Sequence, residues 1–174
     1  MIVGMPGAGK SLASQVASGM KMPIFVSGDV IRSEAKKMGL SPNKKNLGKL
    51  MLQIRNSEGM GAVARRLVPL IKKSPSRNIV YEGARSIEEI EELAKHYNVS
   101  VIAIHASPKT RFRRLLKRKR GDRPKTWADF SKRDKRELSV GVGRVISSAN
   151  RMVENEDSII ALERRMRRVL KTLA

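Results

Sequence analysis

The segment GMPGAGKS, at residues 4–11, constrains the fold more than any other feature of the sequence. Gly4, Gly9, Lys10 and Ser11 follow the spacing G-x-x-x-x-G-K-[ST]. Glycines let backbone N–H groups turn inward around phosphate oxygens, and the helix that follows points its positive end at the same anion. We expect Lys10 to reach the β- and γ-phosphates of a nucleotide, and the Ser11 hydroxyl to bind magnesium. The motif therefore predicts a strand, a phosphate-binding loop (P-loop) and a helix, in preference to a chance glycine-rich turn.

Apolar runs and helical spacing predict the rest of the fold. Strands are expected at residues 1–3, 22–26, 78–81 and 100–106, with a weaker fifth at 151–155. Helices are expected over 10–20, 29–38, 46–73 and 86–97, the last opening with a capping box of Ser86 and Glu89. Strands that alternate with helices form right-handed crossovers and a mostly parallel sheet covered on both faces. Only three residues precede the loop, so the first strand is either clipped or begins upstream.

This pattern predicts an α/β fold of the P-loop NTPase type, with five strands in one sheet. We expect a single domain over residues 1–174. Two helical excursions interrupt the alternation, at residues 30–75 and 108–148.

The composition of the chain bounds its partners and its compartment. Lys and Arg total 37 against 16 Asp and Glu, which gives a net charge of +21. This excess indicates an anionic partner, although a basic surface adapted to a salty or hot cytoplasm is an alternative. The absence of cysteine excludes disulfides and cysteine-ligated zinc. No apolar run approaches the roughly 20 residues of a membrane span, so we expect a cytoplasmic protein with no membrane contact.

Two segments that follow predicted strands carry charged residues suited to binding phosphate. In SGDVIR (27–32), Asp29 stands where open α/β sheets bind ligands, and Arg32 lies one helical turn later. In YEGARS (81–86), Glu82 is an acid near the P-loop, suited to holding magnesium through water, and Arg85 is a second guanidinium fork for phosphate. The alternative is structural: Asp29 caps a helix and pairs with Arg32, and Ser86 caps the next helix.

With these segments, the chain resembles the nucleoside monophosphate kinases, such as adenylate kinase, and looks most like an archaeal branch of adenylate-kinase-related P-loop proteins. The resemblance also rests on HASPKTRFRRLLKRKRGD (105–122) and on Arg133–Asp134 followed by EL, and it spans nearly the whole chain. It implies ATP and Mg²⁺ as cofactors. The implied ATP-binding loop comprises Gly4, Met5, Pro6, Gly7, Ala8, Gly9, Lys10 and Ser11. Asn155, after the fifth strand, is implied to line the pocket of the donor adenine.

The same resemblance implies an acceptor site and a lid. Asp29, Arg32 and Arg85 correspond to residues at the acceptor phosphate, and Glu82 to the acid that holds the magnesium water. Catalytic roles are implied for Lys10, for the lid-base residues Arg114, Arg118 and Arg120, and for Arg133 on the returning helix. Lid arginines would neutralise charge on the transferred group and exclude water. Trp127 is expected to anchor the lid.

The sequence departs from the adenylate kinase pattern at the third strand. Adenylate kinases usually carry Asp-Gly-Phe-Pro-Arg there, whereas this chain has Glu82 as the acid and places Arg85 one residue sooner. The base of the acceptor is not defined, because residues 40–70 hold only Asn46, Gln53 and Arg55 as candidate contacts.

Three functions therefore remain open. The first is a kinase that transfers phosphate from ATP to a nucleotide acceptor, with AMP as one candidate. The second is a kinase of the dephospho-coenzyme A type, in which Asp29 would act as base toward a hydroxyl. The third is a nucleic-acid-associated ATPase that binds nucleic acid without sequence preference through the basic segment at residues 163–174. The oligomeric state is left open.

Overall fold

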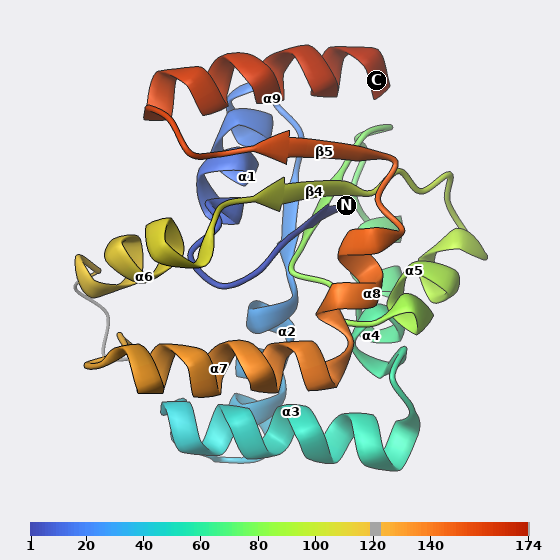
Figure 1. Cartoon of the computed structure of the whole chain (residues 1–174). Coiled ribbons are helices and arrows are strands. Elements are labelled where there is room, and N and C mark those ends of the chain that lie inside the picture. The colour runs from blue at the N-terminus through green and yellow to red at the C-terminus, as the bar shows by residue number, and fades with distance from the viewer. Residues whose placement is uncertain (119–122, 174) are drawn as a thin grey trace.

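The computed structural model describes residues 1–118 and 123–173, and its centre is a five-stranded sheet (Figure 1). All strand pairings among the described residues are parallel, in the order β2-β3-β1-β4-β5. The strands are β1 (Ile2–Val3), β2 (Ile24–Val26), β3 (Val80–Glu82), β4 (Ile102–His105) and β5 (Arg151–Glu154). The predicted five-stranded α/β sheet is therefore confirmed, including the weak fifth strand, which pairs with β4.

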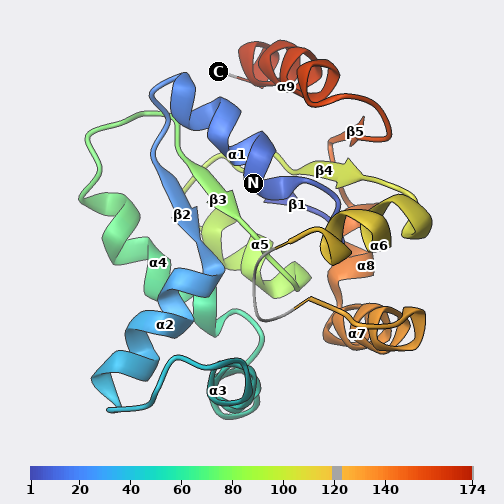
Figure 2. The ribbon, with the colours of Figure 1, turned by 90° about the vertical axis from the view of Figure 1, so that its left-hand side faces the viewer.

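Helices cover both faces of the sheet (Figures 1 and 2). One face packs against α1 (Lys10–Gly19) and α9 (Ile159–Leu173), which also contact each other. The opposite face carries α2 (Ser27–Lys37), α3 (Lys44–Glu58), α4 (Ala62–Lys72), α5 (Ile87–Ala94) and α8 (Val142–Ser147). The last two helices, α6 (Pro108–Leu116) and α7 (Trp127–Val140), belong to the predicted lid region.

Alternation along the strands sorts side chains into two cores. Ile2 and Ile102 belong to the core under α1 and α9, whereas their neighbours Val3 and Ala103 belong to the core on the other face. Adjacent residues of a strand point to opposite faces, so a strand buried on both sides needs an unbroken apolar run. This requirement explains why the central strands were visible in the sequence.

Two local predictions were wrong. The apolar pattern over residues 46–73 is not one helix, because α3 ends at Glu58 and α4 begins at Ala62. Gly59 ends α3 with a positive φ of 87°, a backbone conformation that glycine adopts without a Cβ clash. The capping box at α5 does not form, since Ser86 donates instead to the Met60 carbonyl and Glu89 is fully buried.

Within the described ranges, none of the helices combines the length and the apolar character that crossing a bilayer requires.

Candidate active site

The P-loop connects β1 to α1 and closely approaches the neighbouring elements. Gly4, Gly7 and Gly9 have φ angles of 147°, 83° and 108°, which side-chain-bearing residues rarely adopt. A Cβ on Gly4 would lie 2.4 Å from the Ile104 carbonyl oxygen, and one on Gly9 would lie 2.2 Å from Nδ2 of Asn155. Both backbone conformation and packing therefore require glycine at these positions.

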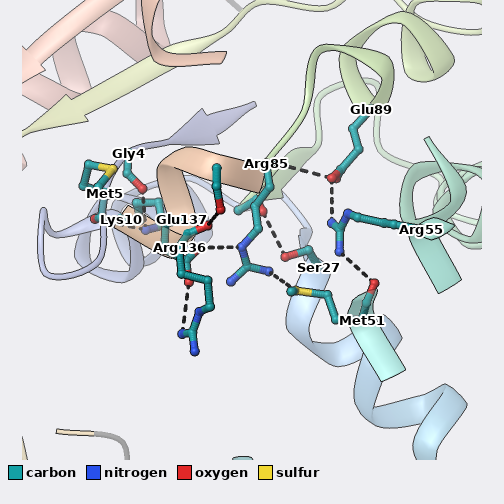
Figure 3. A network of polar contacts seen from close by, with 12 residues as sticks. Gly4, Met5, Lys10, Ser27, Met51, Arg55, Arg85, Glu89, Arg136 and Glu137 are labelled. Atoms are coloured by element: carbon teal, nitrogen blue, oxygen red, sulfur yellow. Dashed lines mark hydrogen bonds and ion pairs between the residues drawn. The ribbon is translucent and has the colours of Figure 1, made fainter. Parts of the chain in front are cut away.

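Lys10 lies inside the loop at the start of α1. Its Nζ donates to the carbonyl oxygens of Gly4, at 2.8 Å, and of Met5, at 3.3 Å (Figure 3). Burial lowers the pKa of Lys10 to about 8, although the nearby Glu82 carboxylate opposes this shift. The low pKa of Lys10 shows that the surrounding protein supplies too little negative charge to stabilise the charged amine fully. An anion held in the loop would supply it.

Ser11 and Glu82 meet at the edge of the loop. The Ser11 hydroxyl donates to Oε1 of Glu82 at 3.1 Å, which joins the first turn of α1 to the end of β3. A hydroxyl beside a carboxylate offers the oxygen ligands that Mg²⁺ prefers, with the remaining positions left to water and substrate phosphates. The chemistry of Ser11 and Glu82 therefore fits the magnesium-binding role predicted for them.

A cavity of about 170 Å³, here called the loop cavity, opens above these residues. The P-loop, Lys10 and Ser11 form one wall, and Glu82 and Arg85 line it from the end of β3. Arg118 and Arg133, both predicted as catalytic, also line it, the first after α6 and the second from α7. The structure thus brings together, around one small polar space, residues that are far apart in sequence.

A larger cavity of about 1000 Å³ adjoins the loop cavity and is here called the α3–α7 cavity. It is lined by residues of α2 and α3 and by residues of α7. Arg85, Arg133 and Glu137 line both cavities, so the two spaces share a wall. Nε of Arg85 donates to Oε2 of Glu137 at 2.9 Å, and its Nη1 contacts Sδ of Met51 at 3.4 Å (Figure 3).

Asp29 and Arg32 lie in the first turns of α2, and Arg32 lines the α3–α7 cavity. Nε of Arg32 donates to Oδ1 of Asp29 at 3.1 Å, and the two form an exposed ion pair. Asp29 makes no side-chain cap of the helix. The ion pair between Asp29 and Arg32, which a purely structural role predicts, is therefore present. Arg32 nevertheless also lines the cavity.

Of the other predicted residues, Arg114 and Asn155 meet behind the P-loop. Asn155 is buried and donates from Nδ2 to the Ala8 carbonyl at 2.7 Å. Its own carbonyl accepts from Nη1 of Arg114 at 2.8 Å, and burial lowers the pKa of this arginine. Asn155 therefore supports the loop directly and Arg114 supports it through Asn155. The role of Asn155 at the donor adenine and the catalytic role of Arg114 at the lid base stay predictions. Arg120 lies outside the described residues.

Candidate contacts within residues 40–70 also serve the structure. Asn46 donates to the Ser41 carbonyl at the start of α3. Arg55 is 3% exposed and pairs with the fully buried Glu89 at 2.8 Å, and Glu89 also accepts from the Tyr81 hydroxyl. Gln53 is exposed and is not among the residues that line the α3–α7 cavity.

Sequence reasoning missed two carboxylates of the site region. Glu137 follows Arg133 by four residues on α7, a spacing that places both on one helix face and could have revealed it. Asp134 pairs with Arg111 through two contacts, one of 2.8 Å, while Nη1 of Arg111 also donates to the Pro6 carbonyl of the loop at 3.2 Å. Arg111 and Asp134 therefore connect α6, α7 and the P-loop.

Trp127 packs edge-on against Phe112, with 5.2 Å between the ring centroids, which is consistent with the predicted role as an anchor of the lid.

Comparison with known proteins places this site in a family. A family described as "AAA domain" matches residues 3–131. The chain is 38% identical over 173 residues to a UPF0200 protein of Hyperthermus butylicus, covering 99% of this chain and 93% of that protein. It is 41% identical over 170 residues to a UPF0200 protein of Methanosarcina mazei, covering 97% of this chain and 91% of that protein.

Two solved structures share the fold at low sequence identity. The protein TT1252 from Thermus thermophilus superposes with a TM-score of 0.68 at 18% identity, over 99% of this chain and 96% of that one. Shikimate kinase from Bacteroides thetaiotaomicron gives a TM-score of 0.68 at 15% identity, over 98% and 96%. The sheet order, the P-loop and these likenesses agree on a P-loop fold like that of shikimate kinase. The chain belongs to the AAA domain family and is a relative of the UPF0200 proteins.

Proposed function

We propose that this protein is an ATP- and magnesium-dependent phosphotransferase that moves the γ-phosphoryl group of ATP to a phosphate of a nucleotide acceptor. The observation that carries the proposal is the shared wall: Arg85, Arg133 and Glu137 line both the loop cavity and the α3–α7 cavity. A donor phosphate in the first cavity and an acceptor phosphate in the second would meet at this wall. In-line transfer requires such contact between the two reacting groups.

The transfer itself needs little from the protein beyond charge and position. The bond between the γ-phosphorus and the β–γ bridging oxygen breaks, and a bond forms to an oxygen of the acceptor phosphate, with ADP as the leaving group. Because the acceptor arrives as an anion, no side chain has to remove a proton. Lys10, Arg118 and Arg133 supply positive charge where negative charge collects, and the loop amides hold the donor.

Ser11 and Glu82 are the residues that would hold Mg²⁺. When bound, the ion supplies charge neutralisation at the β- and γ-oxygens. Within this chain, Glu82 also faces Lys10 and favours its charged form.

A phosphate acceptor is favoured over a hydroxyl acceptor by the environment of Asp29. A hydroxyl acceptor needs a base, and Asp29 is the residue that the dephospho-coenzyme A type of reaction would use. Its carboxylate is paired with Arg32 and is 63% exposed, whereas a general base has to lie within hydrogen-bond reach of the hydroxyl that it deprotonates. The kinase named among the structural neighbours supports the reaction class and says nothing of the acceptor.

The experiment is a transfer assay with Mg-ATP and a panel of nucleoside monophosphates, run on the natural protein and on Lys10→Ala and Arg85→Ala. We expect transfer to one or two acceptors, lost in both variants. ATP bound without transfer to any acceptor would overturn the proposal.

A second candidate, nucleic-acid binding at α9, rests on a separate observation. Four basic residues of this helix are exposed on the side away from the sheet: Arg164, Arg167, Arg168 and Lys171. A row of cations fits a phosphate backbone, and such binding weakens steeply with salt. Replacing these four residues by Gln should abolish salt-sensitive RNA binding and leave phosphoryl transfer unchanged; RNA binding that survives the replacement would contradict this role.

A further inference from the structure

The α3–α7 cavity is far more cationic than the chain as a whole. Among the described residues that line it, six of thirteen are Lys or Arg, compared with 37 of 174 in the full sequence. The six are Arg32, Lys45, Lys49, Arg85, Arg133 and Arg136. Lysine and arginine are therefore about twice as frequent among the residues that line the cavity as in the whole chain.

Among the described residues, none serves as a counter-ion to the two lysines of this cavity. Asp29 pairs with Arg32, and Glu137 accepts from Arg85 and lies 3.7 Å from Nη2 of Arg136. Lys45 and Lys49 form no ion pair with any residue that the structure describes, whereas exposed Lys37 and Lys95 each pair with a glutamate of their own helix. Lys45 and Lys49 are thus available to an anionic ligand in the cavity.

The unpaired lysines form a group of their own, on a different element from the shared wall. Lys45 and Lys49 are four residues apart on α3 and so project from one face of that helix. Met51 of the same helix contacts Arg85 at 3.4 Å, which fixes α3 beside the wall. Lys49 and Lys45 precede Met51 by two and six residues, or about 3 and 9 Å along the helix axis. An anion bound by these lysines would therefore be held by α3, whereas a phosphate at Arg85 and Arg133 would be held by the turn after β3 and by α7.

Apolar residues also line this cavity. Ile31 of α2 and Leu47, Met51 and Leu52 of α3 line the same cavity. A volume of about 1000 Å³ suits a nucleotide, and apolar walls with a few placed charges are typical of such sites. The cavity thus combines an apolar lining with cations on α3, on α7 and in the turn after β3.

We propose that the acceptor carries a second phosphate group in addition to the one that receives the phosphoryl group. This inference rests on the proposed function. The accepting phosphate lies at Arg85 and Arg133, next to the loop cavity, and the second lies against Lys45 and Lys49. A nucleoside 3′,5′-bisphosphate and the 5′-phosphorylated end of a short oligonucleotide both have this chemistry.

Binding measured by calorimetry tests the inference while a non-hydrolysable ATP analogue with Mg²⁺ saturates the loop cavity. The probes are AMP, adenosine 3′,5′-bisphosphate and the dinucleotide pApA. We expect the bisphosphate or the dinucleotide to bind about tenfold or more tightly than AMP, as charge-assisted phosphate contacts allow. Whichever of the two binds more tightly identifies the source of the second phosphate.

Two double variants locate the effect. Lys45→Ala/Lys49→Ala should reduce the preference over AMP to about twofold or less. Lys132→Ala/Lys135→Ala removes the same charge from exposed positions of α7 that do not line the cavity, and should keep the preference. Equal binding of all three probes, or a preference that survives loss of Lys45 and Lys49, would overturn the inference. If AMP still receives phosphate from Mg-ATP in that event, the proposed function stands. The proposed function itself fails only if none of the probes receives phosphate.

Discussion

Arg85 donates from Nε to the carboxylate of Glu137 at 2.9 Å, and both residues line the loop cavity as well as the α3–α7 cavity. The pair joins the turn after β3 to α7, two segments that are 52 residues apart in sequence. It holds the guanidinium at the boundary where donor and acceptor phosphates are proposed to meet. Glu137 is therefore a positioning residue, which acts through Arg85.

Glu137→Gln tests this positioning role. Removal of the charge leaves Arg85 with a weaker acceptor, so we expect lower kcat with a smaller change in KM for ATP, together with a loss of about 1 to 3 kcal/mol in unfolding free energy. Steady-state kinetics and urea unfolding measure both effects. An unchanged kcat in a variant with reduced stability would assign Glu137 to structure alone.

The pH dependence of stability gives this pair a second signature. Burial raises the pKa of Glu137, but Arg85 outweighs burial and the net pKa lies below the usual 4.5. A carboxyl with a depressed pKa stabilises the fold above its unfolded pKa, and the contribution is lost as the pH falls through the folded pKa. Glu137→Gln should therefore lie below the natural protein in stability at pH 7 and approach it below about pH 4.

The sequence was sufficient for the P-loop and the order of elements, because these depend on local patterns. Gly4, Lys10 and Ser11 are recognisable by spacing, and central strands such as β4 by unbroken apolar runs. It was insufficient where a side chain finds a distant partner. Ser86 and Glu89 match a capping box, but Glu89 is instead buried between Tyr81 and Arg55, 34 residues away from the latter.

The functional site follows the same division. Glu82 and Ser11 lie beside each other as expected, because β3, which ends at Glu82, pairs with β1, which precedes the P-loop. Glu137 and the lysines of α3 were missed, since nothing in a single sequence says that α3 and α7 face one cavity. Helix packing sets that relationship, and the apolar spacing of a helix does not specify its neighbour.

The buried amine of Lys10 should make nucleotide binding depend on pH. Burial lowers its pKa to about 8, and a bound phosphate would restore the charged form. We expect the natural protein to take up a proton when it binds Mg-ATP at pH 8 to 9, and Lys10→Met to take up none from this group. Calorimetry in buffers of different ionisation enthalpy measures the uptake; equal uptake by both proteins would contradict the assignment.

Lys10 should also lower the stability of the nucleotide-free fold. A lysine with a depressed pKa destabilises the folded state, fully below the folded pKa, and the penalty is relieved as pH rises from about 8 toward the unfolded value of 10.5. Lys10→Met should therefore raise the Tm at pH 7 while lowering the transfer rate by about 10²-fold or more. A lower Tm in the variant would contradict this prediction.

Gly9 should tolerate no side chain. Its φ of 108° is strained for alanine, and a Cβ would lie 2.2 Å from Nδ2 of Asn155. We expect Gly9→Ala to lose about 2 kcal/mol or more in unfolding free energy and to bind ATP weakly. Gly19→Ala, at the end of the same helix with no atom within 4 Å of the added carbon, is the control and should be neutral or stabilising.

Among the described ion pairs around the lid region, the pair of Arg111 with Asp134 should contribute most to stability. Removal of its carboxylate should therefore cause the largest loss of unfolding free energy. The Arg111 side chain is only 5% exposed, and it also donates to the carbonyl oxygens of Ala106 and Pro6. Asp134→Ala leaves a buried charge without its carboxylate, so we expect a loss of about 3 to 5 kcal/mol in unfolding free energy. Asp157→Ala removes the exposed partner of Arg165 and should cost about 1 kcal/mol or less. Chemical denaturation of both variants checks the difference, and similar losses would show that Arg111 is stabilised by its carbonyl contacts and not by Asp134.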